Sequence, residues 1–142
     1  MRKVLVPFDG SKSATHALQY AIKLAKQRGN LSIHVVHAHE EPLIYGEIEV
    51  YVSNEKMAEL QRKHSNGLLA AAEKLLRKAA VTYTKEITVG HIADAIAQRA
   101  DELHCDCIVM GTRGMTAIVN LVMGSVATKV VHLANVPVTL VK

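Results

Sequence analysis

The sequence predicts an α/β fold in which one open sheet of parallel strands carries helices on both faces. Short apolar runs rich in β-branched residues alternate along the chain with longer segments whose apolar residues recur at helical spacing. The resulting order β-α-β-α-β-α-β-α-β is typical of a parallel sheet, because parallel strands need a crossover between them. With 142 residues and no linker-like or repeated segment, we expect a single domain over residues 1–142.

The chain opens with a strand and a helix. Residues 3–10, KVLVPFDG, predict a buried strand closed by Pro, Asp and Gly. Residues 11–29 predict a helix that Ser11 or Ser13 can cap and that Gly29 can end in a left-handed conformation. Its apolar residues share one face: Ala14, Ala17, Leu18, Ala21, Ile22 and Ala25.

The middle of the chain predicts two strands separated by a loop and a long helix. Residues 31–38 form the second expected strand and residues 81–89 the third. Residues 39–54 read as a loop, and a helix follows from about Glu55 to Ala80, which Gly67 weakens without ending. The expected apolar face of this helix is Leu68, Ala71, Ala72, Leu75, Leu76 and Ala79.

The last part of the chain completes the alternation. A helix follows Gly90, residues 107–110 form a short fourth strand that ends at Gly111, and a last helix runs from Ser125 through Leu133. Residues 136–141, VPVTLV, predict the fifth strand. The helix after Gly90 has one apolar face, made of Ile92, Ala93, Ile96, Ala97, Ala100 and Leu103.

Composition and charge exclude several classes of function. The formal net charge is +4, and its basic residues are spread along helix-like segments, which disfavours a nucleic-acid partner. No stretch is long and apolar enough for a membrane span or a signal peptide, and Cys105 and Cys107 agree with a reducing compartment, so we expect a cytoplasmic protein. His37 and His39 share a strand face, but without a patterned carboxylate nearby we expect no metal site.

The segment GTRGMTAIVNLVMGS carries a spacing of glycines that suits a phosphate chain. Gly111 ends a strand, where it lets the backbone pass close to a sugar, and Gly114 permits a turn that other residues resist. Gly124 stands just before the last helix, whose free N–H groups favour anions, and Ser125 adds a hydroxyl. We expect the apolar stretch AIVNLVM, between Gly114 and Gly124, to pack down as a flap. The segment does not match the other phosphate-binding loop motifs, G-x-x-x-x-G-K-[ST] and G-x-G-x-x-G.

The sequence resembles the universal stress protein family, in its ATP-binding branch. The resemblance covers the whole chain and rests on VLVPFDGS, on IVMGTRG followed by GSVATKVV, and on VPVTLVK. It implies the strand order 3-2-1-4-5 and a homodimer, which we expect to form through the last strand, from Val136 to Val141. It also implies ATP, or ADP or AMP in its place, with or without Mg²⁺, bound where the strand order reverses.

The resemblance implies roles for residues at matching positions. Asp9 is expected to face the adenosine, although it could instead cap the following helix, and the backbone of Ala38 is expected to meet the adenine edge where the family usually has Val. Arg113 is either a phosphate partner or an exposed side chain. The expected contact residues are Pro7, Asp9, Ala38, Met110, Gly111, Arg113, Gly114, Gly124, Ser125 and Val126.

The expected function is that of a regulatory stress-response protein that binds an adenine nucleotide without efficient catalysis. The first alternative is a slow ATP hydrolase or phosphotransferase, but Asp9 is the only strong candidate metal carboxylate, and the motif contains no lysine. The second alternative is a flavodoxin-like electron carrier. The chain has no Trp and one Phe, so it offers few aromatic side chains for a flavin ring.

Overall fold

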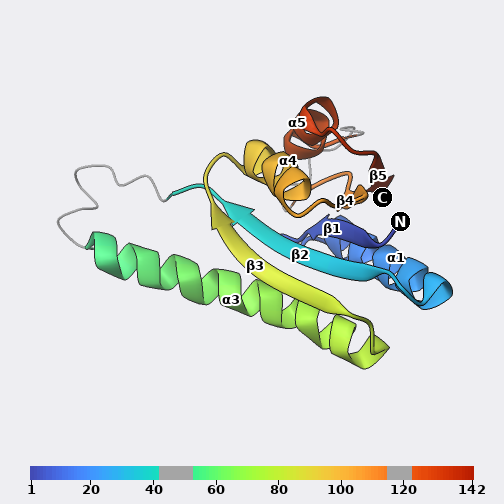
Figure 1. The fold of residues 1–142 in the computed structure, drawn as a ribbon. Coiled ribbons are helices and arrows are strands. Elements are labelled where there is room, and N and C mark those ends of the chain that lie inside the picture. Colours follow the sequence, from blue (N-terminus) through green and yellow to red (C-terminus); the bar gives the residue numbers. More distant parts are fainter. Residues whose placement is uncertain (42–52, 115–122) are drawn as a thin grey trace.

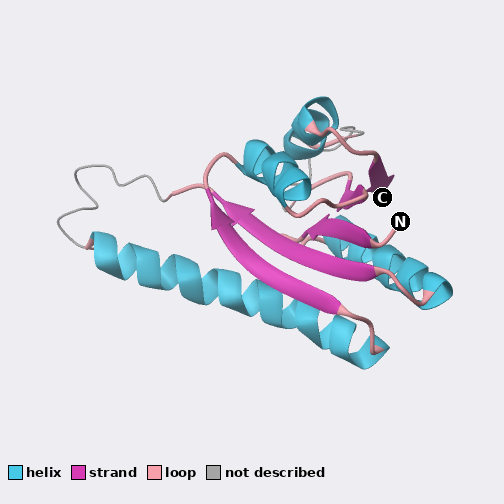
Figure 2. Ribbon diagram, viewed as in Figure 1, coloured by secondary structure: helices cyan, strands magenta, loops and turns pink. Residues whose placement is uncertain are grey.

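The computed structural model describes residues 1–41, 53–114 and 123–142, and these form a parallel sheet. The strands are β1 (Lys3–Pro7), β2 (Ser32–His39), β3 (Tyr83–Val89), β4 (Cys107–Gly111) and β5 (Val138–Val141). Their order in the sheet is β3-β2-β1-β4-β5, and every neighbouring pair is parallel (Figures 1 and 2). The predicted fold class and strand order are therefore confirmed.

Helices cover both faces of the sheet (Figure 1). Helices α1 (Lys12–Arg28) and α3 (Asn54–Ala79) pack on one face, and α4 (Ile92–Glu102) and α5 (Ser125–Leu133) pack on the other. Each face has its own aliphatic core, because the sheet lies between the two layers and successive strand side chains point to opposite faces. None of the described helices is long and apolar enough to cross a membrane.

The ends of α1 show how short-range chemistry sets the element boundaries. The Ser11 hydroxyl accepts a hydrogen bond from the Ala14 N–H at 3.2 Å, so Ser11 is the cap and Ser13 is not. Gly29 ends the helix with φ of 73°, in the left-handed region where the sequence placed it. Ser53 caps α3 by accepting from the Lys56 N–H, which starts that helix one residue before the predicted Glu55.

The buried face of α3 differs from the predicted one. The structure buries Ser65, Leu69, Ala72 and Leu76, whereas Ala71, which was expected inside, is exposed. Two adjacent rows of this helix carry Leu and Ala at helical spacing, so periodicity alone does not choose between them. The polar Ser65 is accommodated in the core because its hydroxyl accepts a hydrogen bond from Gln61 Nε2 at 3.1 Å.

The two edges of the sheet differ in chemistry. At the β3 edge, Lys85 forms an ion pair with Glu73 of α3. At the other edge, β5 pairs only with β4 among the described strands, and residue Leu140 is 37% exposed. The observed β5 begins at Val138 rather than at the predicted residue 136, directly after Pro137, which has no N–H to donate.

Candidate nucleotide-binding site

A cavity of about 380 Å³ opens where the strand order reverses, at the carboxyl ends of β1, β2 and β4. Ligands of open α/β sheets bind at this place, because the loops after neighbouring strands diverge there. The structure brings all ten predicted contact residues to the lining of this cavity. These are Pro7, Asp9, Ala38, Met110, Gly111, Arg113, Gly114, Gly124, Ser125 and Val126.

One half of the cavity is apolar. Val36 and Met110 contribute buried side chains from β2 and β4, and Ile92 and Ile96 contribute side chains from α4. Aliphatic surfaces of this kind bury the faces of a flat ring and leave its polar edge to be recognised elsewhere. The sequence analysis placed both isoleucines on the apolar face of their helix but did not assign them to the site. Their position on that apolar face was the signal that could have identified them as lining residues.

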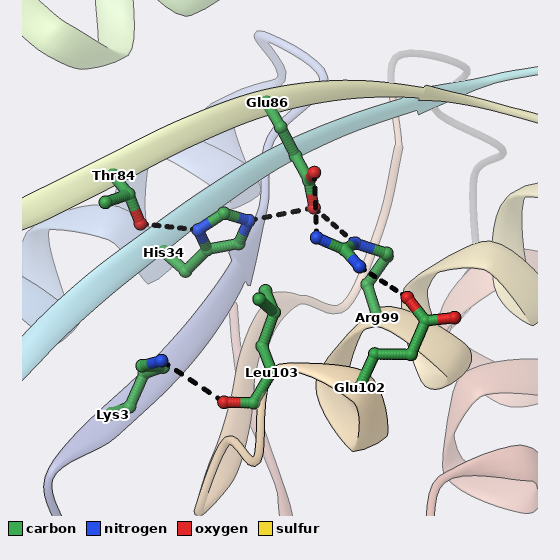
Figure 3. A network of polar contacts seen from close by, with 7 residues as sticks. All are labelled: Lys3, His34, Thr84, Glu86, Arg99, Glu102 and Leu103. Atoms are coloured by element: carbon green, nitrogen blue, oxygen red, sulfur yellow. Dashed lines mark hydrogen bonds and ion pairs between the residues drawn. The ribbon is translucent and has the colours of Figure 1, made fainter.

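Helix α4, which supplies this apolar surface, is tied to the sheet by a polar network (Figure 3). Arg99 binds both oxygens of Glu86 on β3, with Nε 2.6 Å from Oε1 and Nη2 3.0 Å from Oε2, and it also pairs with Glu102. His34 on β2 lies 2.9 Å from Glu86 Oε1 and 2.6 Å from Thr84 Oγ1. Burial raises the pKa of Glu86, but the hydrogen bonds from Arg99 and His34 outweigh it and lower the pKa overall. Sequence analysis missed this network.

The other half of the cavity presents the amino end of α5. Gly124 is the N-terminal cap residue, with φ of −70° and ψ of 162°, and within the described residues no side chain caps the helix there. The first N–H groups of an α-helix have no partner within the helix, so those after Gly124 remain available to an anion. A Cβ at Gly124 would lie 3.3 Å from the Thr112 carbonyl oxygen and 3.4 Å from Arg113 Cα, so glycine keeps the two parts of the loop close.

The structure explains why residue 111 is glycine, for a reason that the sequence did not indicate. A Cβ at this position would lie 2.7 Å from the Ser13 carbonyl carbon and 2.8 Å from the Ala14 nitrogen, inside the first turn of α1. The absence of a side chain therefore lets α1 pack against the end of β4. Gly114 also differs from the expectation, because its φ lies outside the left-handed region; its Cβ would instead lie 3.3 Å from Asp9 Oδ2.

Replacing Gly111 by alanine is expected to destabilise the fold even without ligand. The added methyl would collide with backbone atoms of α1 that cannot rotate away, and overpacking of this kind typically costs about 2 kcal/mol. Urea denaturation of the ligand-free protein measures this cost. A variant with unchanged stability would show that α1 does not pack against Gly111 in solution.

Hydrogen bonds join the loop after β1 to the loop after β4. Asp9 Oδ1 accepts from the Ser11 N–H at 2.9 Å, so Asp9 braces the turn before α1 while Ser11 caps the helix. The Ser13 hydroxyl donates to the Arg113 carbonyl at 2.5 Å. The Arg113 side chain is exposed at the mouth of the site. The two loops therefore hold each other in place beside the cavity.

The peptide group of Ala38 faces the cavity side of β2 without a backbone partner among the described residues. The Val36 carbonyl accepts from the Phe8 N–H at 2.8 Å, on the β1 side, and the His39 carbonyl accepts from the Gly90 N–H at 3.0 Å, on the β3 side. Peptide groups alternate between the two sides of a strand, so Ala38 directs its N–H and C=O toward the β1 side, just beyond the end of β1. One donor and one acceptor are thus available at the edge of the apolar half.

Residues 117–122 of the predicted flap lie outside the described residues, as do residues 42–52 of the predicted loop. Across the described parts of the chain, no group of three or more His, Cys, Asp or Glu side chains is arranged to hold a metal ion. Both cysteines are free and buried.

A model of the universal stress protein family matches residues 1–142. The chain belongs to this family. It is 32% identical over 147 residues to the universal stress protein YxiE of Bacillus subtilis, an alignment that covers 99% of this chain and 98% of YxiE. Its resemblance to the family is therefore confirmed over its full length.

Solved universal stress protein structures share the fold. The structure of MJ0577 from Methanocaldococcus jannaschii superimposes with a TM-score of 0.85 at 26% identity, covering 99% of this chain and 95% of that one. The universal stress protein of Archaeoglobus fulgidus, solved in complex with dAMP, superimposes with a TM-score of 0.68 at 28% identity and covers 100% of this chain and 98% of that one.

Proposed function

We infer that this universal stress protein binds an adenine nucleotide, with ATP as the leading candidate, in the cavity at the switch point of the sheet. The observation that carries the proposal is that an apolar half lies beside the Ala38 peptide and that the amino end of α5 at Gly124 lies in the same cavity. Neither the Ala38 peptide nor this helix end has a protein partner among the described residues. The dAMP complex of the Archaeoglobus fulgidus relative supports the same ligand class. Equilibrium dialysis tests it, and protein that binds none of ATP, ADP and AMP would overturn it.

The two halves suit the two ends of a nucleotide. The base lies between the β-strand side chains and Ile92 and Ile96, with its edge at the Ala38 peptide. The phosphates lie at the amino end of α5, where the N–H groups and the Ser125 hydroxyl can donate. The Asp9 carboxylate and the Ser125 hydroxyl are oxygen donors suited to Mg²⁺, which commonly binds proteins through one or two carboxylates together with substrate phosphates.

The protein acts as a homodimer through β5. The Thr112 N–H donates to the Val141 carbonyl and the Ile108 N–H to the Pro137 carbonyl, so the alternating peptide groups of Val138 and Leu140 face the open edge. An open edge with an exposed leucine favours pairing with another strand. A twofold axis between two β5 strands pairs them antiparallel and leaves neither edge open.

We propose a regulatory role because the site favours binding over chemistry, and we place the protein in the cytoplasm. Backbone N–H groups and one hydroxyl hold a ground-state phosphate about as well as a transition state, and uniform binding of that kind does not accelerate cleavage. Asp9 Oδ1 accepts a hydrogen bond from the Ser11 N–H, so part of the acceptor capacity of this carboxylate is used to brace the turn before α1. The alternative, slow hydrolysis of ATP, depends on Arg113 as the exposed cation at the mouth of the site.

Phosphate release under saturating Mg-ATP is expected to stay far below about one per second, the lower end of ordinary enzyme turnover. Wild-type protein, Arg113→Ala and Asp9→Ala should give the same trace rate if that rate comes from contamination. A wild-type rate above about one per second that either substitution abolishes would establish the enzyme in place of the binding protein.

A further inference from the structure

His37 is a buried histidine that the proposed function leaves without a role. It lies on β2, its residue is 7% exposed, and its Nδ1 atom lies 2.8 Å from the Phe8 carbonyl oxygen. A carbonyl oxygen only accepts hydrogen bonds, so Nδ1 carries the proton and donates. The contact joins β2 to the first residue after β1, in the loop that lines the cavity.

The Phe8 carbonyl is the acceptor that the regular ladder would offer to Ala38. In a parallel pair of strands, a residue donates its N–H to the carbonyl of one residue on the neighbouring strand. Its own carbonyl then accepts from the N–H of the residue two positions further along that neighbouring strand. Phe8 donates its N–H to the Val36 carbonyl, so its own carbonyl would accept from the Ala38 N–H if pairing continued. That bond is missing between these two described residues, and the His37 ring holds the carbonyl instead.

The side chains of His37 and Ala38 lie on opposite faces of the sheet, so the hydrogen bond from His37 pulls the Phe8 carbonyl toward one face. Val35, two residues before His37, packs in the core beneath α1 and α3, and the His37 ring lies 6.5 Å from the ring of His64 on α3. Ala38 packs toward the core beneath α4 and α5. The His37 hydrogen bond therefore draws the Phe8 carbonyl toward the α1 and α3 face, away from the ladder position beside Ala38.

We propose that His37 is a positioning residue for base recognition, which holds the Phe8 carbonyl away from Ala38 and so keeps the Ala38 peptide free for the base edge of the nucleotide. The proposal rests on nucleotide binding at the switch-point cavity. It adds that the fold keeps β1 and β2 from completing their ladder, so that one backbone donor and one backbone acceptor stay available to a ligand. His37 itself does not touch the ligand.

Burial is the main reason that the His37 ring stays neutral. Burial lowers its pKa most, the Phe8 carbonyl raises it, the neighbouring His39 and His64 lower it, and Asp9 raises it, with a net lowering. The His39 ring lies 5.9 Å away on the same strand. A neutral ring needs a proton on only one nitrogen, and the Phe8 carbonyl selects Nδ1.

The first test compares His37→Phe with His37→Asn, using ATP and inorganic tripolyphosphate as ligands in titration calorimetry. Phenylalanine keeps the ring shape without a donor, whereas the asparagine amide nitrogen occupies nearly the position of Nδ1. His37→Phe should weaken ATP binding about tenfold, the magnitude of one to two hydrogen bonds, with unchanged tripolyphosphate binding. His37→Asn should restore ATP binding to within about threefold of wild type. His39→Phe changes the neighbouring ring, whose Nδ1 lies 2.9 Å from the Glu40 carbonyl oxygen, and should match wild type.

The outcomes separate this inference from the proposed function. A wild-type protein that binds no ATP would reject nucleotide binding itself. If wild type binds ATP and His37→Phe binds it equally well, or loses both ligands equally, His37 has no role in positioning the base-binding peptide.

A second test uses the wild-type protein alone. Nitrogen-15 spectra of the His37 imidazole should place its proton on Nδ1, and hydrogen exchange of the Ala38 amide should be fast in the ligand-free protein and slow with ATP. A proton on Nε2, or an Ala38 amide already protected without ligand, would overturn the proposal.

Discussion

Millimolar ATP is expected to raise the melting temperature of the nucleotide-free protein by about 10 °C. With micromolar affinity, this concentration is about a thousandfold excess and stabilises the folded state by roughly 4 kcal/mol. The reason lies in the site, which binds ligand only when β1, β4 and α5 are assembled around the cavity. Differential scanning fluorimetry with ATP, ADP and AMP measures the shift.

Gly124→Val should abolish the shift. Its Cβ would already lie 3.4 Å from Arg113 Cα, and the added methyl groups would fill the space in which phosphate approaches the amino end of α5. The variant should fold, since a φ of −70° is open to every residue. Gly67→Val in α3 is the matched control, because its Cβ position has no described atom within 4 Å apart from its chain neighbours and the adjacent backbone of its own helix. An ATP shift that survives in Gly124→Val would place the phosphates elsewhere.

Leu140→Lys is expected to convert a dimer into a monomer. In an antiparallel pairing of two β5 strands, symmetry brings the two introduced ammonium groups close to each other, and like charges across strands repel. The substitution also removes an apolar side chain at the edge, from a residue that is 37% exposed. Sedimentation equilibrium at micromolar concentration distinguishes the two states.

Leu60→Lys controls for charge and lost hydrophobicity. Leu60 lies on α3 and is 48% exposed, similar to Leu140, but it belongs to an element that packs near the opposite edge of the sheet. This variant should remain a dimer. A monomeric wild type, or a dimer that persists in Leu140→Lys, would show that β5 is not the interface.

The order of elements could be predicted because each segment carries one clear period. The apolar run of β1, the helical spacing of α1 and the left-handed Gly29 are local signals, and each agrees with its neighbours. Gathering of the predicted contact residues at one cavity also follows from the order of elements, since the carboxyl ends of parallel strands meet at one edge of the sheet.

What escaped prediction depends on contacts between residues far apart in the chain. Nothing near Gly111 in sequence indicates that Ser13 and Ala14 lie against it. The binding of His37 to the Phe8 carbonyl spans 29 residues, and the binding of Arg99 to Glu86 joins a helix to the strand before it. Polar pairs of this kind have no period, so a pattern search passes over them.

The unequal edges of the sheet limit how far this protein can assemble. A sheet whose two edge strands can both pair with strands of other copies can grow indefinitely, as in fibrils. Here the ion pair of Lys85 with Glu73 places charge at the β3 edge, which discourages strand addition there. The proposed association through β5 alone would use the same edge in both copies, so assembly would stop at the dimer. Raising the protein concentration would then increase the fraction of dimers without producing longer filaments.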